Sequence, residues 1–369
     1  MAVYLTLTAV TLLLAAFIRN GENVQLNNVC TTQGVMTRQR ALNICMAVAI
    51  FLLLTGVSAC RIAVGNDYWV YRFQFNLIMQ ERHVSYEMGF NLVVWLIQTL
   101  LGYDNYLPVF AFFSIVTCYF FVKAMYDQAE DFVFTLFLLM TGGYYFNSLN
   151  SVRYYFVLAI ALYAMKYVLR KQYAHFIFWI VVASLFHKSV LLVIPAYLVA
   201  LYLAEHKLKK WHYALGCVLI ASLIFGQNLY REIIFYFYPY YRDSVFDISQ
   251  LSWVNIAKCG AVLALCLITW KRGFSQSRAI RFGFYLNLAG FVGYCCGSFI
   301  PEVSRVCYYF IISQIFLLPA LLRRMQDGWF KKLCYVGVIG AFLCYFAMLL
   351  KGMYAINIRL LPYLNWIFN

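Results

Sequence analysis

Residues 147–197 read NSLNSVRYYFVLAIALYAMKYVLRKQYAHFIFWIVVASLFHKSVLLVIPAY, and this stretch decides the fold. Two apolar runs in it are each long enough to form a helix, and the basic pair Arg170–Lys171 separates them. Arg153 stands before the first run, and His187 follows the second. A hairpin of two helices therefore places Arg153 and His187 at one end and the basic pair at the other.

The composition of the whole chain is that of a membrane protein. Of its 369 residues, 64% are hydrophobic and 12% are charged, whereas soluble domains average about 45–50% and about 25%. Apolar runs recur along the whole length, and about 20 residues of helix cross a bilayer core of about 30 Å. We therefore expect an all-α, polytopic fold in which residues 1–369 form a single integral membrane domain.

The apolar runs predict twelve spanning helices. We expect them at residues 2–18, 41–60, 107–122, 132–146, 154–169, 173–186, 190–203, 213–225, 254–270, 282–299, 306–322 and 333–350.

The net charge of +15 is concentrated in short loops between the apolar runs. Basic residues in such loops act as orientation signals and contact lipid headgroups, so we expect membrane lipids and no nucleic acid as partners. The positive-inside rule places the loops around 19–40, 123–131, 166–171, 207–210, 271–281 and 323–332 in the cytoplasm. Both termini are then expected on the periplasmic side.

The segment Met88–Leu101 does not fit this alternation. It is short for a span, and a crossing here would put Lys123 on the wrong side of the membrane. We therefore expect a re-entrant or in-plane helix with both ends outside. Irregular backbone at membrane depth is tolerated only where protein or a wet cavity surrounds it, so the segment indicates a nearby site.

Most unusual polar residues fall on the same outer face. Residues 61–106 and 226–251 form two long outer segments rich in aromatic residues, and we expect both to contribute to the site. The tyrosines there fit either an aromatic belt at headgroup level or a cleft in which sugars stack on rings. The ionisable residues at this face or its rim are Asp67, Arg72, Glu81, Arg82, His83, Glu87, Arg153, His187, Lys188, Arg231, Arg242, Asp243, Asp247, Glu302, Arg305 and Arg359.

These residue types suit an anionic ligand that carries sugars. Arginine forms bidentate contacts with phosphate, whereas carboxylates and histidine exchange protons near neutral pH. Arg153 and Arg305 each begin a span, where the positive end of the helix dipole disfavours a cation. A bound anion would relieve this, so the pattern predicts a site for a lipid diphosphate.

Each of these residues also has a purely structural interpretation. Asp67 and Glu87 can pair with Arg72 or Arg82 within the outer segment, and His187 can cap a turn with Ser189. Arg231 and Arg242 are also typical of solvated loop charges. Cysteines provide no zinc motif, although Cys295, Cys296 and Cys307 lie near enough in sequence to allow a disulfide.

Several short motifs have a recognisable order along the chain. They are Gly65-x-Asp67-Tyr68, Glu87-x-Gly89-Phe90, Arg153 with Ala159 about two turns later, Phe186-His187-x-Ser189 and Leu361-Pro362-Tyr363. Together they resemble the EpsG family of bacterial polysaccharide polymerases, which are related to Wzy-type O-antigen and capsule polymerases. Tyr154 and Met88 depart from that pattern, since the family often has glutamine and proline there.

The resemblance implies a glycosyltransferase of the bacterial inner membrane with a periplasmic active site. It would join polyprenyl-diphosphate-linked oligosaccharides, which serve as both donor and acceptor, and release polyprenyl diphosphate. No cofactor or metal is expected, and a chain-length regulator protein is a further expected partner. The catalytic base would be Glu87, Asp67 or His187. The residues expected to bind substrate are Arg153, Arg305, Arg72, Arg242, Tyr68, Tyr154, Ser189 and Glu302.

Three other functions fit parts of the pattern. A flippase for the same lipid-linked sugar needs charges that reach both membrane sides and an internal repeat. A membrane O-acyltransferase needs a site open to the cytoplasm, where His175, His206 and His212 look like surface residues. An O-antigen ligase differs only in its acceptor, which is a lipid core.

Overall fold

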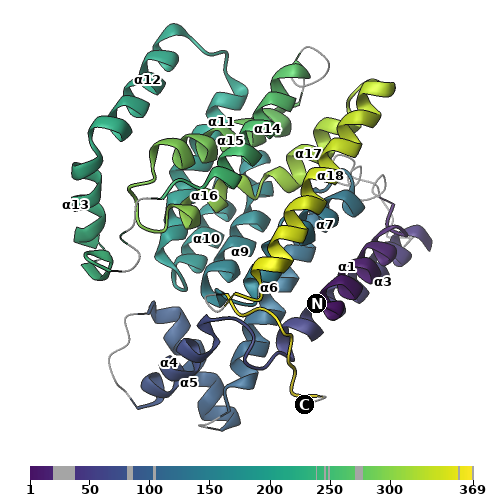
Figure 1. Ribbon diagram of the computed structural model, residues 1–369, viewed down its shortest axis with the longest axis vertical. Coiled ribbons are helices and arrows are strands. Elements are labelled where there is room, and N and C mark those ends of the chain that lie inside the picture. The colour runs from purple at the N-terminus through teal and green to yellow at the C-terminus, as the bar shows by residue number, and fades with distance from the viewer. Residues whose placement is uncertain are drawn as a thin grey trace. The chain divides into compact units, whose positions relative to one another are not determined.

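The computed structural model describes residues 1–19, 38–80, 86–102, 105–237, 239–244, 247, 250–270, 277–355 and 358–367. It is 78% helical. Within the described ranges there is no strand, and Arg61 and Asn365 form one isolated antiparallel bridge. The all-α prediction is confirmed (Figure 1).

The helices belong to two compact units, Met1–Leu191 with Asp327–Asn369, and Leu192–Gln326. The first unit contains α1 (Ala2–Ala15), α3 (Arg38–Ala59), α4 (Asp67–Met79), α5 (Met88–Leu101), α6 (Leu107–Gln128), α7 (Phe132–Thr141), α8 (Tyr144–Ser148), α9 (Val152–Leu169), α10 (Tyr173–Ser184) and α18 (Trp329–Gly352). The second unit contains α11 (Val193–Glu205), α12 (Lys210–Phe225), α13 (Gln227–Phe237), η2 (Pro239–Tyr241), α14 (Trp253–Ile268), α15 (Arg278–Cys296), α16 (Val303–Ile311) and α17 (Gln314–Arg323). The short helix η1 (Lys188–Leu192) lies where the units join.

Helix α9 forms the core of the first unit. Of its 18 residues, only Arg153, Tyr167 and Leu169 are not fully buried. A helix that is apolar around its whole circumference needs neighbours on every side. Helices α6 and α10 pack along it, and α3 packs on α6 (Figure 1). The hairpin predicted from residues 147–197 is therefore the centre of this unit.

Six helices of the described chain are long and apolar enough to cross a membrane, or seven if the bent pair α12 and α13 forms one span. Five more apolar helices are only 10–17 residues long. These lengths support a multi-pass membrane protein. The full count of twelve spans and the periplasmic location of both termini stay predictions.

One predicted span is broken by glycine. The expected helix at 132–146 divides into α7 and α8 at Gly142–Gly143. Gly143 has a φ of +79°, which favours glycine, and a Cβ there would lie 2.7 Å from Leu349 Cδ2 of α18. The break therefore lets α18 approach closely.

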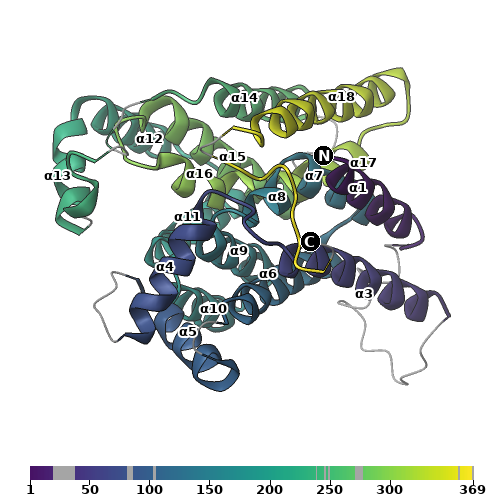
Figure 2. The same ribbon diagram turned by 60° about the horizontal axis from the view of Figure 1, so that its bottom comes forward.

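The outer segments 61–106 and 226–251 contain two helices that the apolar runs did not predict, α4 and α13. In α4, the buried residues Tyr68, Tyr71 and Phe75 recur at helical spacing. The apolar segment at Met88–Leu101 is a helix with the predicted bounds, and it packs against α4 (Figure 2). Its re-entrant or in-plane position stays a prediction.

The second unit is organised around α15, which packs against α11, α14 and α16. Asn287 Nδ2 donates to the Cys259 carbonyl at 3.0 Å, and Gln314 Nε2 donates to Asn287 Oδ1 at 2.6 Å. Such buried amide contacts join helices where water is absent. All eleven described cysteines are free, Cys295, Cys296 and Cys307 among them.

The segment after α18 holds the entry to α4 in place. Ile62 N donates to Leu364 O at 3.0 Å, and Gly65 N donates to Arg359 O at 2.8 Å. Tyr363 Oη donates to Val57 O at 2.9 Å. These bonds satisfy backbone groups of an irregular segment and so fix the start of α4.

The expected orientation can be tested by cysteine labelling in sealed membrane vesicles. Asn105→Cys should react with an impermeant maleimide only from the periplasmic face, and Lys171→Cys only from the cytoplasmic face. The two residues lie before α6 and just beyond the end of α9. Labelling of the unsubstituted chain measures the background reaction of its own cysteines. Reaction of Asn105→Cys from the cytoplasmic face alone would rule out the proposed topology.

Candidate functional site

The beginnings of three helices meet in the first unit. Asp67 begins α4, Glu87 precedes the first residue of α5, and Arg153 is the second residue of α9. The backbone N–H of Asp67 donates to Asn150 Oδ1 at 3.0 Å, which joins the starts of α4 and α9. Each helix start carries partial positive charge, so the place where they meet favours anions.

Glu87 and Arg153 form an ion pair at this place. Arg153 Nη1 lies 2.5 Å from Glu87 Oε2, and the side chains are 14% and 13% exposed. The other carboxylate oxygen, Oε1, accepts a hydrogen bond from the backbone N–H of Lys188 at 3.0 Å. Removing one partner of a pair this buried costs about 3–5 kcal/mol, because the other charge is left without compensation.

Aromatic rings surround the guanidinium of Arg153. Its Cζ lies 3.5 Å from the centre of the Tyr86 ring and 5.2 Å from that of Phe90. Burial raises the pKa of Tyr86 to about 12, with a further contribution from Tyr71, so the phenol stays neutral at physiological pH. Arg153 Nε is buried and has no hydrogen-bond partner among the described residues. The guanidinium therefore retains an unused donor beside its bond to Glu87.

Gly89 allows α5 to reach this position. Its backbone N–H donates to Leu185 O at 2.8 Å, at the end of α10. A Cβ on Gly89 would lie 2.8 Å from both Leu185 Cβ and Leu185 O. Only glycine leaves room for this contact between α5 and Leu185. The contact places Glu87 beside Lys188 and Arg153.

His187 lies in the turn after α10, beside the ion pair. Its Nδ1 lies 2.8 Å from Ser189 Oγ, and its ring meets that of Tyr154 edge to face, with the ring centres 5.9 Å apart. The structure thus confirms the turn contact with Ser189. Because Lys188 N binds Glu87, the same turn connects the histidine to the carboxylate.

Asp67 joins the same cluster from α4. Its Oδ2 accepts a hydrogen bond from Ser151 Oγ at 3.1 Å. Ser151 stands two residues before Arg153, so this bond holds Asp67 beside the start of α9. The three candidate bases therefore converge on the start of α9.

Arg72 and Tyr68 lie on α4 but face α6. The Arg72 guanidinium lies 4.5 Å from the Tyr106 ring centre and 5.4 Å from that of Trp69. Tyr68 is buried and stacks on Phe110, with 4.6 Å between ring centres. Glu87 pairs with Arg153 rather than with Arg72. Arg82, like Glu81 and His83, lies outside the described residues.

The remaining candidates belong to the second unit. Arg242 pairs with Glu232 at 2.5 Å, and both side chains are more than half exposed. Arg305 Nε lies 3.1 Å from Glu302 Oε2 at the start of α16, where Glu302 has a left-handed backbone with a φ of 54°.

Three residues of the site were not predicted from the sequence. Tyr86 supplies the ring beneath Arg153, and Asn150 and Ser151 connect Asp67 to α9. Gly89 was named only as part of a motif, without its role in the close approach. Asn150 and Ser151 precede an apolar run, a position where such residues commonly cap helices. This position could have identified Asn150 and Ser151 from the sequence. The contact of Tyr86 with Arg153 depends on tertiary structure and could not.

Within the described ranges, no three His, Cys, Asp or Glu side chains gather closely enough to hold a metal ion. The absence of a cofactor stays an expectation.

The fold and the ion pair define a multi-pass helical membrane protein with an arginine–carboxylate centre at the meeting of three helix starts. The sequence profile of the EpsG family matches residues 44–365, so the chain belongs to the EpsG family. Comparison with curated proteins and with solved structures finds no match. The matched residues include α4, α5, α9 and the turn that carries His187.

Replacing Gly89 with alanine should destabilise the first unit. The added Cβ overlaps Leu185, and overpacking of this kind costs about 1–3 kcal/mol. We expect a lower melting temperature for the detergent-purified protein, measured by intrinsic tryptophan fluorescence.

Gly337→Ala in α18 is the matched control, because no atom lies within 4 Å of a Cβ there. Equal melting temperatures for Gly89→Ala and Gly337→Ala would contradict the docking role of Gly89.

Proposed function

We propose that this protein is a polysaccharide polymerase that joins lipid-linked oligosaccharide repeat units in the bacterial inner membrane. Membership of the EpsG family and the helical membrane fold support this class. The observation that carries the proposal is the Glu87–Arg153 pair, with Asp67 and His187 beside it. The proposed site faces the periplasm.

The proposed reaction is a displacement at an anomeric carbon. A hydroxyl oxygen at the non-reducing end of one repeat unit attacks the anomeric carbon of the growing chain. The bond from that carbon to the diphosphate breaks, and polyprenyl diphosphate leaves with the bonding electrons. The hydroxyl proton passes to a base on the protein, which restores the balance of charge and atoms.

Arg153 is the proposed partner of the leaving diphosphate. Its guanidinium is fixed by Tyr86 and Phe90, so little side-chain order has to be created when substrate binds. Oriented donors at the point where negative charge develops are the strongest electrostatic contribution to catalysis. The starts of α4, α5 and α9 add partial positive charge at the same place.

Glu87 is the proposed base, and its pairing suggests how it is activated. In the resting protein Oε2 of Glu87 is bound by Arg153 Nη1. A diphosphate that draws Arg153 toward itself would release this oxygen to accept the hydroxyl proton. Binding of the donor would then prepare the base for the acceptor.

Asp67 and His187 are the alternative bases, and both are held by hydroxyl groups close to Arg153. Arg305 with Glu302, Arg72 and Arg242 are proposed to assist substrate binding, with Tyr68, Tyr154 and Ser189 shaping the surroundings. The proposed role in substrate binding has the weakest support for Arg242, because its ion pair with Glu232 is exposed. A chain-length regulator remains a proposed partner.

Arg153→Ala should abolish long-chain polymer. Arg153→Lys should lower the rate of polymerisation at least tenfold, because lysine lacks the planar guanidinium that binds phosphate through two hydrogen bonds. Loss of a single oriented charge in an active site costs about 10²–10³ in rate. The assay is a reconstituted reaction of the purified protein with one defined polyprenyl-diphosphate-linked repeat unit, read by mass spectrometry.

Lys331→Ala is the control for loss of an ion pair, since Lys331 binds the almost fully exposed Asp327. Polymer of normal length from Arg153→Ala would remove Arg153 from the site. Transfer only to a lipid core acceptor would identify a ligase instead of a polymerase.

Glu87→Gln should lower polymerisation about 10²-fold or more, as expected for loss of a general base. His187→Gln and Asp67→Asn should lower it less. Initial rates at saturating substrate distinguish the variants. Full activity of Glu87→Gln together with an inactive Asp67→Asn or His187→Gln would transfer the role of base to that residue.

A further inference from the structure

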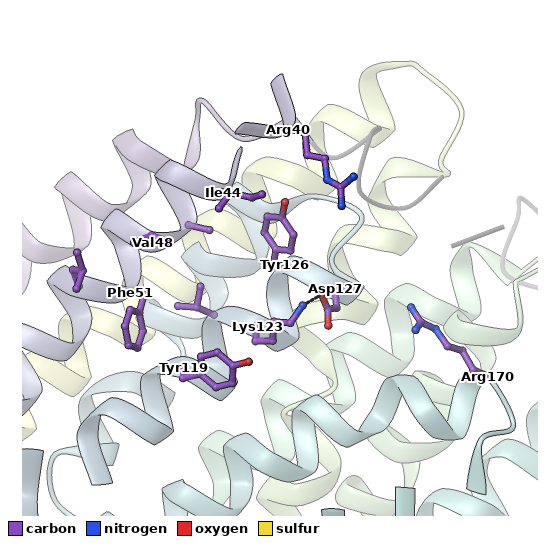
Figure 3. Close-up of a pocket in the computed structure, with 12 residues that line it drawn as sticks. Arg40, Ile44, Val48, Phe51, Tyr119, Lys123, Tyr126, Asp127 and Arg170 are labelled. Carbon is purple, nitrogen blue, oxygen red and sulfur yellow. Dashed lines mark hydrogen bonds and ion pairs between the residues drawn. The ribbon is translucent and has the colours of Figure 1, made fainter. Parts of the chain in front are cut away.

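The opposite end of α9 carries a second cluster of charges, far from the ion pair of Arg153. A cavity of about 840 Å³ lies there between α3 and α6. Arg40 of α3, Lys123 of α6 and Arg170 at the end of α9 line its polar part (Figure 3). Three of the six basic segments predicted to be cytoplasmic therefore contribute to one cavity.

One carboxylate, Asp127, lies among these cations and is already compensated. Its Oδ1 lies 2.6 Å from Lys123 Nζ, and its Oδ2 lies 2.6 Å from Nζ of the buried Lys166. Among the described residues that line the cavity, Arg40, Lys123 and Arg170 are basic and only Asp127 is acidic. The excess of positive charge is complementary to an anionic group.

The rest of the cavity is apolar. Ile44, Val48 and Phe51 follow Arg40 along one face of α3, and all three line the cavity (Figure 3). Ile44 and Val48 are 37% and 49% exposed. A ligand that fits has a charged head at Arg40 and an apolar chain beside α3.

The length of the apolar face selects the type of lipid. Eleven residues separate Arg40 from Phe51, which is about 17 Å of helix at about 1.5 Å per residue. Half of a bilayer core of about 30 Å is about 15 Å. The face thus matches one leaflet, as an acyl chain does, whereas a long polyprenyl chain would extend beyond it.

We propose that this cavity is a binding site for one anionic phospholipid of the cytoplasmic leaflet. The headgroup phosphate lies among Arg40, Lys123 and Arg170, and an acyl chain lies along Ile44, Val48 and Phe51. The site is separate from the ion pair of Glu87 and Arg153, because the length of α9 lies between Arg153 and Arg170.

Native mass spectrometry of the purified full-length protein tests the site, with phosphatidylglycerol and phosphatidylcholine offered at equal concentration. We expect one phosphatidylglycerol to be retained per chain in preference to phosphatidylcholine. The double variant Arg40→Gln with Arg170→Gln should lower that retention about 25-fold, from roughly a fivefold contribution of each basic residue.

Arg38→Gln is the matched control, because Arg38 begins the same helix but does not line the cavity. It should change retention less than twofold. Val48→Trp keeps every charge but fills the apolar half, so it should also release the lipid. Melting temperature reports whether each variant is folded.

Three outcomes would overturn the proposal. They are equal retention of phosphatidylcholine, equal loss in Arg38→Gln and in the double variant, and stronger retention of polyprenyl phosphate than of phosphatidylglycerol. The readout is lipid binding, so failure here leaves the proposed polymerase activity unaffected, and the reverse also holds.

Discussion

A cation at the beginning of a buried helix needs an anion close by, and this constraint organises the first unit. Arg153 stands at the positive end of α9, among aromatic rings that cannot solvate it as water does. Glu87 provides the compensating charge, and it reaches Arg153 only because Gly89 lets α5 dock on Leu185. Arg305 in the second unit follows the same rule with Glu302. In both cases the chain itself supplies the compensating carboxylate.

The two ends of α9 have different chemistry. At its start, one arginine and one carboxylate balance each other, so a ligand must displace a charge to bind. At its end, cations outnumber the single carboxylate of Asp127, and a ligand adds to the existing pairs. The first arrangement suits a substrate that binds and leaves, whereas the second suits a molecule that stays. One buried helix thus connects the proposed reaction site with the proposed lipid site.

Sequence patterns predicted the helices well where the apolar run was uninterrupted. The bounds of α5 and the hairpin of α9 and α10 follow from such runs. Helix α4 was not predicted, because charged and aromatic residues in it concealed a helical spacing of Tyr68, Tyr71 and Phe75. The grouping of Asp67, Glu87, Arg153 and His187 was predicted from the expectation that they share one side of the membrane. The pairing of Glu87 with Arg153 could not be predicted from the sequence, because 66 residues separate the two and only packing selects the partner.

The hydrogen bonds between residues 358–366 and residues 60–66 also constrain how the protein matures. Nearly three hundred residues lie between the two segments, so closing this contact requires most of the chain to be inserted first. Asp67 follows directly after the earlier segment and depends on it for position. The corner at the start of α9 is therefore complete only after synthesis has reached α18 and the segment beyond it.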